Sequence, residues 1–569
     1  MIRFTMRAAV LPAGFALALT LAAPGIGATH PGRAPSGRRL SSARRSKVLR
    51  VGTWKGIKGQ YGSIQAAVDA AGAGDWILVG PGDYHELADH RANHGPQPAD
   101  APAGVIISTR GLHLRGMQRN KVVVDGTKPG SPRCSNKEAN QDFGVTGSDG
   151  KPLGRNGVVV WKTDNVSIDN LTACNFLSGA GSAGNEIWWN GGDGTGHIAL
   201  HNLYGSYLTA TSTFFKDAST AASYGIFSSN ASGGRWDYMY GSNMSDSNFY
   251  IGACAQVCNQ VVNHVHSQYS TQGYSGTNAG GTVVIENSEF DHNKAGFTAG
   301  ALNNDDWPSP QDGACHGGGT SPITHTYSCW VFMHNHVHDN NNPNVPGAGI
   351  ASAAPTGTGL LLYGGRDNTI KDNVFANNGA WGIAFVPYPD TETPPSDAVA
   401  AGAACRGGIQ SGPLCLYDDW GNAVTGNQFR HNGFFGNDSN SDFGEITSTA
   451  AATNCYHGNV ELGGGQVTSS PAGLQQSKPV CDRHTVPPDS NPSMTNQVVC
   501  DSGALGTPCP PGANYPPQTK VAMPAVPSNL STMPNPCAGV PANPWCPSHA
   551  RKHRKHHKKH HHAPHGDRD

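Results

Sequence analysis

Two pairs of adjacent aspartates stand directly before a tryptophan, at Asp305-Asp306-Trp307 and at Asp418-Asp419-Trp420. Hydrolysis of a glycosidic bond requires two carboxyl groups, and paired carboxylates can also hold Ca²⁺. The neighbouring indole can stack on the face of a sugar ring. Adjacent acids are also common in turns, which is the alternative interpretation. We take Asp305 and Asp306 as candidate catalytic residues, and Ca²⁺ is the only cofactor that these residues suggest.

Basic residues beside carboxylates offer a second kind of chemistry. β-Elimination from a uronate needs a cation to neutralise the sugar carboxylate and a base to remove the adjacent proton. Between residues 156 and 450 the chain has only eight Lys and Arg residues, and Lys216, Arg235 and Lys294 each stand beside a carboxylate. A solvated surface ion pair is the alternative explanation for each of them. Lys216 and Arg235 are the candidate catalytic cations.

Tryptophans offer a route to function without catalysis. Outward-facing indole rings in a row would form platforms on which successive sugars stack, whereas inward-facing rings would simply fill a core. The candidate substrate-binding residues are Trp188, Trp189, Trp236, Trp307 and Trp420.

A repeated pattern indicates the scaffold that must position these residues. An apolar residue is followed five places later by an aromatic residue or His, and eight places later by Asn. The four sets are Ile285/Phe290/Asn293, Met333/His338/Asn341, Ile370/Phe375/Asn378 and Val424/Phe429/Asn432. Short strands separated by tight turns give such spacing, and each set then belongs to one coil of a solenoid. In that arrangement the Phe residues fill the interior and the Asn residues stack between coils, so both are scaffold.

The beginning of the body predicts a cap for this solenoid. Residues 61–71 form a short amphipathic helix with Ser63 as N-cap, and residues 75–79 form a buried strand. Such a unit covers apolar side chains and unpaired backbone groups at the open end of a coil stack. A leucine-rich repeat is the alternative solenoid, but its dense leucine pattern is missing.

The segment from Tyr61 to Glu86 resembles the capping segment of exported right-handed β-helix proteins of the pectin-lyase-like superfamily. The resemblance implies an all-β, right-handed parallel β-helix. It also implies a polysaccharide substrate, since most known enzymes of this kind act on acidic sugars. The chain lacks the motifs of polygalacturonases, alginate epimerases and pectate lyases, so no catalytic residue is transferred from them. The function remains an inference at the level of fold.

Composition and the chain ends complete the domain organisation. Only 14 % of residues are charged and the net charge is −1, which argues against a nucleic-acid partner. Arg3 and Arg7 precede an apolar run of signal-peptide length, although an uncleaved anchor is an alternative. The predicted parts are a signal peptide (1–28), a basic linker (29–50), the β-helix with inserted loops (51–446), a disulfide-clipped Pro/Cys-rich extension (447–548) and a disordered His/Lys/Arg-rich tail (549–569). We expect a secreted monomer without a membrane span.

The 14 cysteines all follow the predicted signal peptide, and export favours disulfides. The pairs expected first are Cys254/Cys258, Cys315/Cys329, Cys405/Cys415, Cys500/Cys509 and Cys537/Cys546, although spacing alone does not fix connectivity. Zinc binding by Cys254 and Cys258 with His264 and His266 is the alternative.

Two hypotheses on function follow. The first is a polysaccharide lyase or glycoside hydrolase acting on acidic glycans, and the second is a non-catalytic cell-wall or glycan-binding protein. The cationic tail, with seven His from His553 onward, is expected to bind anionic polymers more tightly as the pH falls through about 6.5. A solubilising tail without a partner is the alternative.

Overall fold

The computed structural model describes residues 45–87, 102–181, 183–192, 196–254, 257–303, 309–391, 405–501 and 521–547, with residues 509, 513, 515 and 519. The predicted signal peptide, most of the basic linker and the His-rich tail lie outside the described residues. So does the first candidate acid pair, Asp305-Asp306, with Trp307.

Three long parallel sheets, here called sheets 1, 2 and 3, form the main body of the described part of residues 46–547. Sheet 1 contains β1 (Val48–Val51), β4 (Trp76–Val79), β7 (His113–Gly116), β10 (Ser167–Asp169), β13 (Leu200–Ser206), β16 (Ala231–Asp237), β19 (Gln260–Asn263), β22 (Val283–Glu286), β25 (Trp330–Met333), β28 (Asn368–Lys371), β34 (Ala423–Thr425) and β38 (Cys455–His457). Sheet 2 contains β5 (Gly82–Tyr84), β8 (Val122–Asp125), β11 (Thr172–Cys174), β14 (Thr209–Thr211), β17 (Tyr240–Ser242), β20 (His266–Gln268), β23 (Glu289–Asp291), β26 (His336–His338), β29 (Val374–Ala376), β35 (Gln428–Arg430) and β39 (Val460–Glu461). Sheet 3 contains β6 (Ala103–Ile107), β9 (Asn156–Trp161), β12 (Asn185–Asn190), β15 (Tyr224–Ser229), β18 (Ser247–Gly252), β21 (Gln272–Ser275), β24 (Ala295–Gly300), β27 (Thr358–Tyr363), β30 (Trp381–Val386), β36 (Ser441–Glu445) and β40 (Ser469–Ser470).

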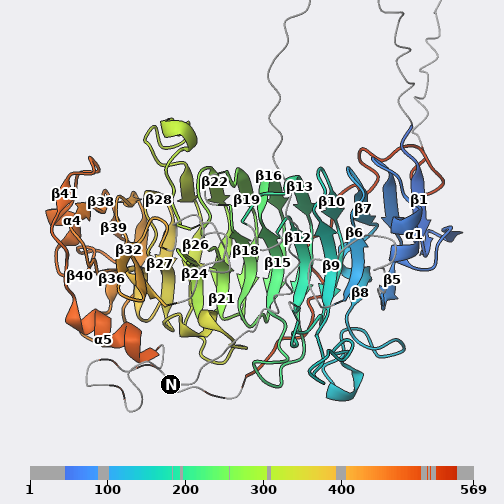
Figure 1. The fold of residues 1–569 in the computed structure, drawn as a ribbon, viewed down its shortest axis with the longest axis horizontal. Helices are drawn as coiled ribbons and strands as arrows, with labels where there is room; N and C mark the ends of the chain where they lie inside the picture. The colour runs from blue at the N-terminus through green and yellow to red at the C-terminus, as the bar shows by residue number, and fades with distance from the viewer. Residues whose placement is uncertain are drawn as a thin grey trace, which may run out of the picture. The chain divides into compact units, whose positions relative to one another are not determined.

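Each coil runs through sheet 1, sheet 2 and sheet 3 in turn, as β22, β23 and β24 do. Every strand of these sheets pairs in parallel with its equivalents in the neighbouring coils, and the coils follow one another from blue to orange in Figure 1. This is the predicted right-handed parallel β-helix, so the fold prediction is confirmed. The strands continue beyond Ile446, where β38, β39 and β40 follow.

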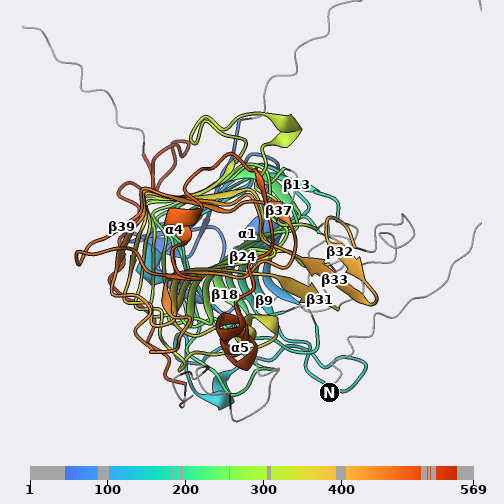
Figure 2. The same cartoon turned by 90° about the vertical axis from the view of Figure 1, so that its left-hand side faces the viewer.

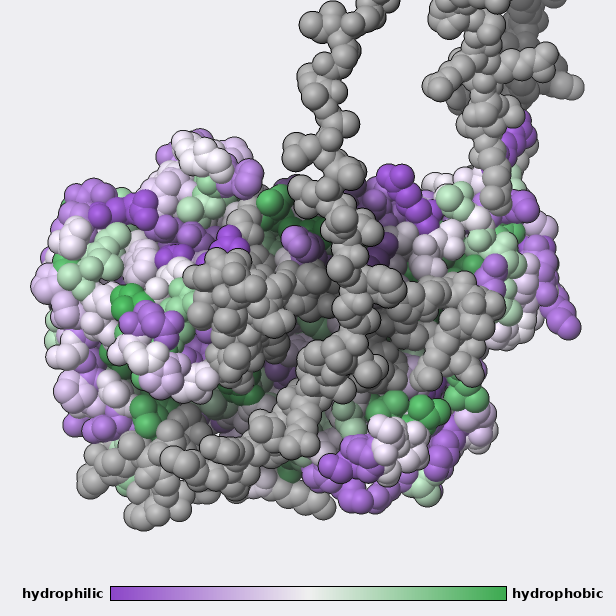
Figure 3. Space-filling model, viewed as in Figure 1, coloured by the Kyte–Doolittle hydropathy of each residue, from purple (hydrophilic) through white to green (hydrophobic). Residues whose placement is uncertain are grey.

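The interior is built from aligned apolar residues. Phe290, Val337, Phe375 and Phe429 occupy equivalent positions in four coils, and all are fully buried. Because apolar side chains fill the coil, the outer surface is left mainly polar, with separate apolar patches in Figure 3. The apolar first members of three of the four predicted sets, Ile285, Ile370 and Val424, lie in one column of sheet 1, as stacked coils require.

One of the four predicted sets was wrong by a single position. Ile285 pairs with Phe332, and Phe332 pairs with Ile370, so the set in this coil is Phe332/Val337/Asn340 instead of Met333/His338/Asn341. Asn340 accepts from the amide of Asn293 at 3.1 Å and donates to Asn378 at 3.2 Å, which fixes it in the ladder. Since strand side chains alternate between faces, the shift turns Met333 and His338 outward.

Helices close both ends of the coil stack. The predicted cap is confirmed as α1 (Ile64–Ala70), where the Ser63 side chain accepts from the backbone of Ala66 and Ile64 is fully buried. At the other end α4 (Leu474–Ser477) buries Leu474 in the same core, and Figure 2 looks onto this end. A further helix, α5 (Pro492–Asp501), packs Met494 against Trp381 outside sheet 3.

Short elements complete the secondary structure. They are the 3₁₀ turns η1 (Arg119–Lys121), η2 (Glu138–Asn140), η3 (His316–Gly318) and η4 (Ile350–Ala353), and the small strands β2 (Thr53–Trp54), β3 (Ile57–Lys58), β31 (Tyr388–Asp390), β32 (Ile409–Ser411), β33 (Leu414–Tyr417), β37 (Ala451–Ala452) and β41 (Thr485–Val486). Among the described residues, no helix has the length and apolar character that crossing a membrane requires.

All five disulfides predicted from spacing are present, so the zinc alternative at Cys254 and Cys258 is wrong. Two longer links, Cys134–Cys174 and Cys455–Cys481, complete the pairing and leave no free cysteine. Residues 521–547 pack back along the coils. The carbonyl of Pro524 accepts from Asn243, and Trp545 donates to the carbonyl of Ile57.

Candidate functional site on the outward face of sheet 2

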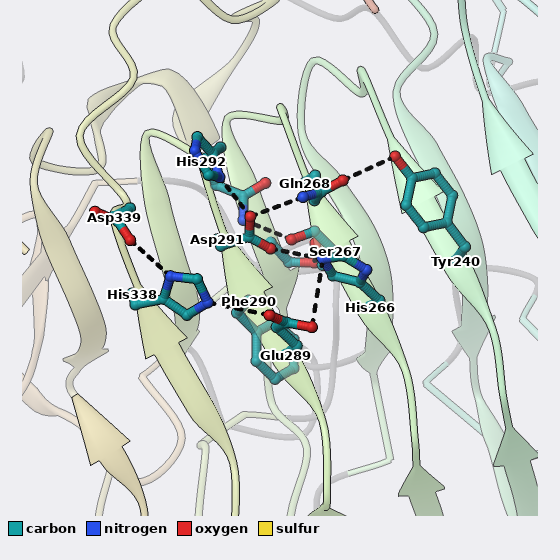
Figure 4. A network of polar contacts seen from close by, with 12 residues as sticks. Tyr240, His266, Ser267, Gln268, Glu289, Phe290, Asp291, His292, His338 and Asp339 are labelled. Carbon is teal, nitrogen blue, oxygen red and sulfur yellow. Dashed lines mark hydrogen bonds and ion pairs between the residues drawn. The ribbon is translucent and has the colours of Figure 1, made fainter. Parts of the chain in front are cut away.

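Histidines, carboxylates and a tyrosine gather on the outward face of sheet 2. In each short strand the middle residue, such as Ser267 or Phe290, is buried, and its two neighbours point outward. Parallel pairing aligns these neighbours in two columns across β17, β20, β23 and β26. We call this set the sheet 2 network: Tyr240, His266, Gln268, Glu289, Asp291, His336 and His338. Figure 4 labels all of them except His336.

Asp291 orients His266. The Asp291 side chain is only 3 % exposed, and it accepts from His266 Nε2 and from Gln268 Nε2, each at 2.7 Å. Burial by itself would raise the pKa of Asp291, but the hydrogen bonds from His266 and Gln268 and the charge of His266 bring it below its ordinary value. Among the described residues, Nδ1 of His266 has no hydrogen-bond partner. A buried carboxylate holding one imidazole nitrogen, with the other nitrogen open, is the arrangement of an oriented general base.

His338 lies between two carboxylates, one from Asp339, which follows it directly in the chain, and one from Glu289 on the neighbouring strand β23. Its Nδ1 is 2.7 Å from Asp339, and its Nε2 is 3.2 Å from Glu289. The hydrogen bond from His338 lowers the pKa of Glu289. Burial would lower the pKa of His338, but its hydrogen bonds to Glu289 and Asp339 outweigh burial and raise it. The negative charge of Glu289 and the positive charge of protonated His338 therefore stabilise each other.

His336 differs from His338 in the direction of its pKa shift. Its ring stacks on that of His338, with centroids 3.9 Å apart. Burial lowers the pKa of His336, and the charge of His338 adds to this effect. His336 therefore stays neutral at pH 7 and keeps a lone pair on one ring nitrogen.

Tyr240 closes the network on the side of β17. Its hydroxyl donates to Gln268 Oε1 at 3.1 Å, and its ring meets that of His266 edge-on at 5.6 Å. Burial raises the pKa of Tyr240 to about 12, so the phenol is a proton donor, not a base, at neutral pH. Figure 4 shows the His266 ring between Tyr240 on one side and Asp291 with Glu289 on the other.

Rings line both edges of this face. At the turn from sheet 1, Tyr207 stacks on Tyr238 at 4.9 Å, and Tyr238 stacks on His264 at 4.8 Å. At the turn to sheet 3, the rings of Tyr269 and His292 lie 5.5 Å apart. All five residues have positive φ. A left-handed backbone costs a bulky residue about 1–2 kcal/mol, whereas Asn or Gly would tolerate it better, so the three tyrosines are candidates for a function outside the fold.

The predicted catalytic cations lie outside the network. Lys216 is exposed in a loop, where it forms an ion pair with Glu138 at 2.5 Å that raises the pKa of the lysine. Arg235 is on β16 in sheet 1 and contacts its near neighbour Asp237 at 2.6 Å. Both contacts are the surface ion pairs that the sequence left as an alternative.

The second candidate acid pair has a structural role. Asp419 is buried and accepts from the backbone amides of Gly364 and Gly365, while Asp418 accepts from those of Ser448 and Thr449. Burial raises the pKa of both carboxyls, most strongly that of Asp419. These acids hold two loops against the coil stack.

The candidate tryptophans divide into interior and outer rings. Trp189 and Trp236 are fully buried and contact each other inside the coils, so their assignment as sugar-stacking platforms was wrong. Alternation along the strand instead places Trp188 on the outer side of sheet 3, where it stacks on Phe227 and is 7 % exposed. Trp420 is partly exposed, with the guanidinium of Arg366 4.9 Å above its ring.

Sequence reasoning missed the sheet 2 network. The available signal was polar residues two positions apart within strands, as in His266-Ser-Gln268, Glu289-Phe-Asp291 and His336-Val-His338. Residues at i and i+2 of a strand share a face, so three successive coils place these pairs side by side.

A hollow lies over sheet 3, apart from the sheet 2 network. It has a volume of about 400 Å³ and is lined mostly by apolar and aromatic residues, including Tyr250, Tyr363 and Tyr388. One carboxylate, Asp246, accepts from Tyr224 at 3.0 Å within it. Since its described lining contains no histidine, this hollow suits binding better than proton transfer.

No protein-family model matches the chain, and neither does any curated protein. Among solved structures, the Azotobacter vinelandii mannuronan C-5 epimerase AlgE4 A-module is 13 % identical with a TM-score of 0.40, covering 70 % of this chain and 90 % of that one. An alginate lyase from Paenibacillus sp. str. FPU-7 is 11 % identical with a TM-score of 0.34, covering 74 % of this chain and 97 % of that one. Pectate lyase Pel9A is 12 % identical with a TM-score of 0.31, covering 73 % of this chain and 78 % of that one. Similarities this low say nothing about the chemistry of the present chain.

Proposed function

We propose that the protein binds a polysaccharide along the outward face of sheet 2 and acts on it by proton transfer through His266. The observation that carries this proposal is the pair of His266 and buried Asp291, in which Nδ1 of the imidazole has no hydrogen-bond partner among the described residues, with stacked rings at the turn that precedes β20. A sugar chain lying across the strands would meet both.

The chemistry follows from the protonation states. A general base must lie within hydrogen-bonding reach of the proton that it removes, and an imidazole nitrogen with a lone pair can accept that proton. Asp291, ionised because its pKa is lowered, fixes the ring and stabilises the cation that forms when Nδ1 accepts a proton. Tyr240, protonated below about pH 12, can return a proton to a leaving oxygen. Proton removal beside a uronate carboxylate is the reaction class that these roles support best.

Two features support a sugar as the substrate. Tyr238 is 42 % exposed in the middle of the stack of Tyr207, Tyr238 and His264, so this stack presents a column of ring edges against which the apolar parts of a sugar can pack. The network also offers donors and acceptors in alternation, as hydroxyl-rich ligands require. Seven disulfides fit export to a compartment in which polysaccharides occur.

A non-catalytic glycan-binding protein is the second candidate. The mostly apolar hollow over sheet 3, which is rich in tyrosine, is the observation that favours it. In that case binding would depend on rings such as Tyr250 instead of on the sheet 2 network.

The test is a screen against neutral and uronate-containing polysaccharides, measuring retention, unsaturated product and new reducing ends for each polymer. We expect retention and cleavage of a uronate polymer, with Tyr238→Ala weakening retention about 10-fold because the middle ring of the stack is lost. Tyr204→Ala is the matched control, since Tyr204 is similarly exposed (47 %) but lies on sheet 1. Retention of no polymer would refute the proposal, and retention without cleavage would favour the binding protein.

A further inference from the structure

We propose that Glu289, His336 and His338 form a binding site for a divalent first-row transition metal ion of the Zn²⁺ type. Each residue offers one ligand atom, and these three atoms lie within 4.8 Å of one another. The site is built on two adjacent strands, β23 and β26, where Glu289 is the register partner of His336. Backbone pairing therefore fixes the separation of the ligands before any ion binds.

The ligand types select the metal. Two imidazoles and one carboxylate are borderline ligands that suit Zn²⁺, Co²⁺ or Fe²⁺, whereas Ca²⁺ and Mg²⁺ prefer oxygen ligands throughout. Atoms about 2.1 Å from one tetrahedral ion lie about 3.4 Å apart. His338 Nε2 and Glu289 are already 3.2 Å apart, so small side-chain rotations complete the arrangement. Three protein ligands leave a fourth position open for water or a sugar oxygen.

The contact between Asp339 and His338 is a second observation that points to a metal site. Its carboxylate accepts from Nδ1 of His338 at 2.7 Å, which fixes the tautomer and directs Nε2 toward Glu289. Metal-binding histidines nearly always have such a carboxylate or carbonyl partner on the other nitrogen. His336 and His338, two residues apart on one face of a strand, then present their rings side by side.

The ion would add a positive charge that does not depend on protonation to a network whose seven residues include no Lys or Arg. Arg430 is aligned with His338 but two strands farther along, about 10 Å away at the usual strand spacing. A metal ion at Glu289 would lie next to His266, whose Nε2 is 3.8 Å from that carboxylate. There it would neutralise a uronate carboxylate. This catalytic role rests on the proposed function, whereas metal binding itself is independent of it.

The test uses full-length protein in which every histidine after Ser548 is replaced by asparagine, so that the tail does not contribute. Zn²⁺ binding is measured by calorimetry, and Co²⁺ binding by its visible absorption, which reports ligand number. We expect one equivalent of tightly bound metal. Glu289→Gln and His336→Asn should each weaken binding more than about 100-fold, and Asp339→Asn about 10- to 100-fold.

His201→Asn is the matched control, because this imidazole also pairs with a carboxylate, Asp164 at 3.3 Å, but the described part of the chain places no third metal ligand beside this pair. It should leave metal binding unchanged. The absence of saturable binding, or binding insensitive to both Glu289→Gln and His336→Asn, would overturn the proposal. Circular dichroism checks whether each variant folds. If His336→Asn does not fold, Glu289→Gln still tests the proposal, because Glu289 is partly exposed. No polysaccharide is present, so failure here is separate from failure of the proposed function.

Discussion

Asn373 offers a quantitative test of how the coils are held in register beneath the sheet 2 network. Its buried side chain donates to the carbonyl of Phe332 and to Asn427, each at 2.9 Å. It accepts from the backbone and side-chain amides of Asn335 at 2.9 and 3.1 Å. Asn335 directly precedes His336, so this ladder sets the turn that leads into the network.

Replacement of Asn373 by Ala removes these four hydrogen bonds and leaves buried polar groups without partners. At about 0.5–1.5 kcal/mol for each bond, the free energy of unfolding should fall by about 2–6 kcal/mol. The measurement is urea unfolding, followed by circular dichroism and by tryptophan fluorescence.

Asn287→Ala provides the comparison, because this exposed side chain makes one hydrogen bond, to Asn263 at 2.9 Å. With the added cost of Ala at positive φ, its loss should be about 1–2 kcal/mol. Equal losses for the two variants would refute the argument that the ladder stabilises the coil stack.

Three further predictions follow from named contacts. Protonated His338 contributes stability to the fold that is complete below its unfolded pKa of about 6.5 and is lost as the pH rises through its raised folded pKa, so His338→Gln should flatten the fall in melting temperature as the pH rises above about 6.5. Joint replacement of Cys134 and Cys174 by Ser opens a loop with a sequence separation of 40 and should lower the free energy of unfolding by about 4 kcal/mol, measured in urea. Asp291→Asn should lower kcat on a cleaved polymer about 10²- to 10⁴-fold with little change in KM and alter the pH profile, which a purely structural role would not do.

The fold could be predicted because its sequence signals are local. Phe and Asn recur at positions where every coil needs an interior ring and a stacked amide, as at Phe375 and Asn378. Disulfides within inserted loops could also be predicted from the sequence, since partners such as Cys405 and Cys415 are close in the chain. The long link Cys134–Cys174 was not, because it joins residues of different coils.

The candidate site could not be predicted because it arises only when coils are stacked. The run Asn340-Asn-Asn342 fits the repeat in more than one frame, and Val337 lacks the aromatic character of its equivalents. The pattern therefore assigned His338 to the interior scaffold. A shift of one residue moved its side chain outward, beside Glu289 from the preceding coil. Charged neighbours in sequence, such as Lys216, proved a weaker guide than register.

The proposed function depends on His266 acting as the base on a bound polysaccharide. His266→Gln tests it most directly, because glutamine can still donate to Asp291 but has no group equivalent to Nδ1. On a polymer that the wild type binds and cleaves, the variant should be retained equally, while product formation falls at least about 100-fold. Undiminished product formation by a folded His266→Gln variant would contradict the account.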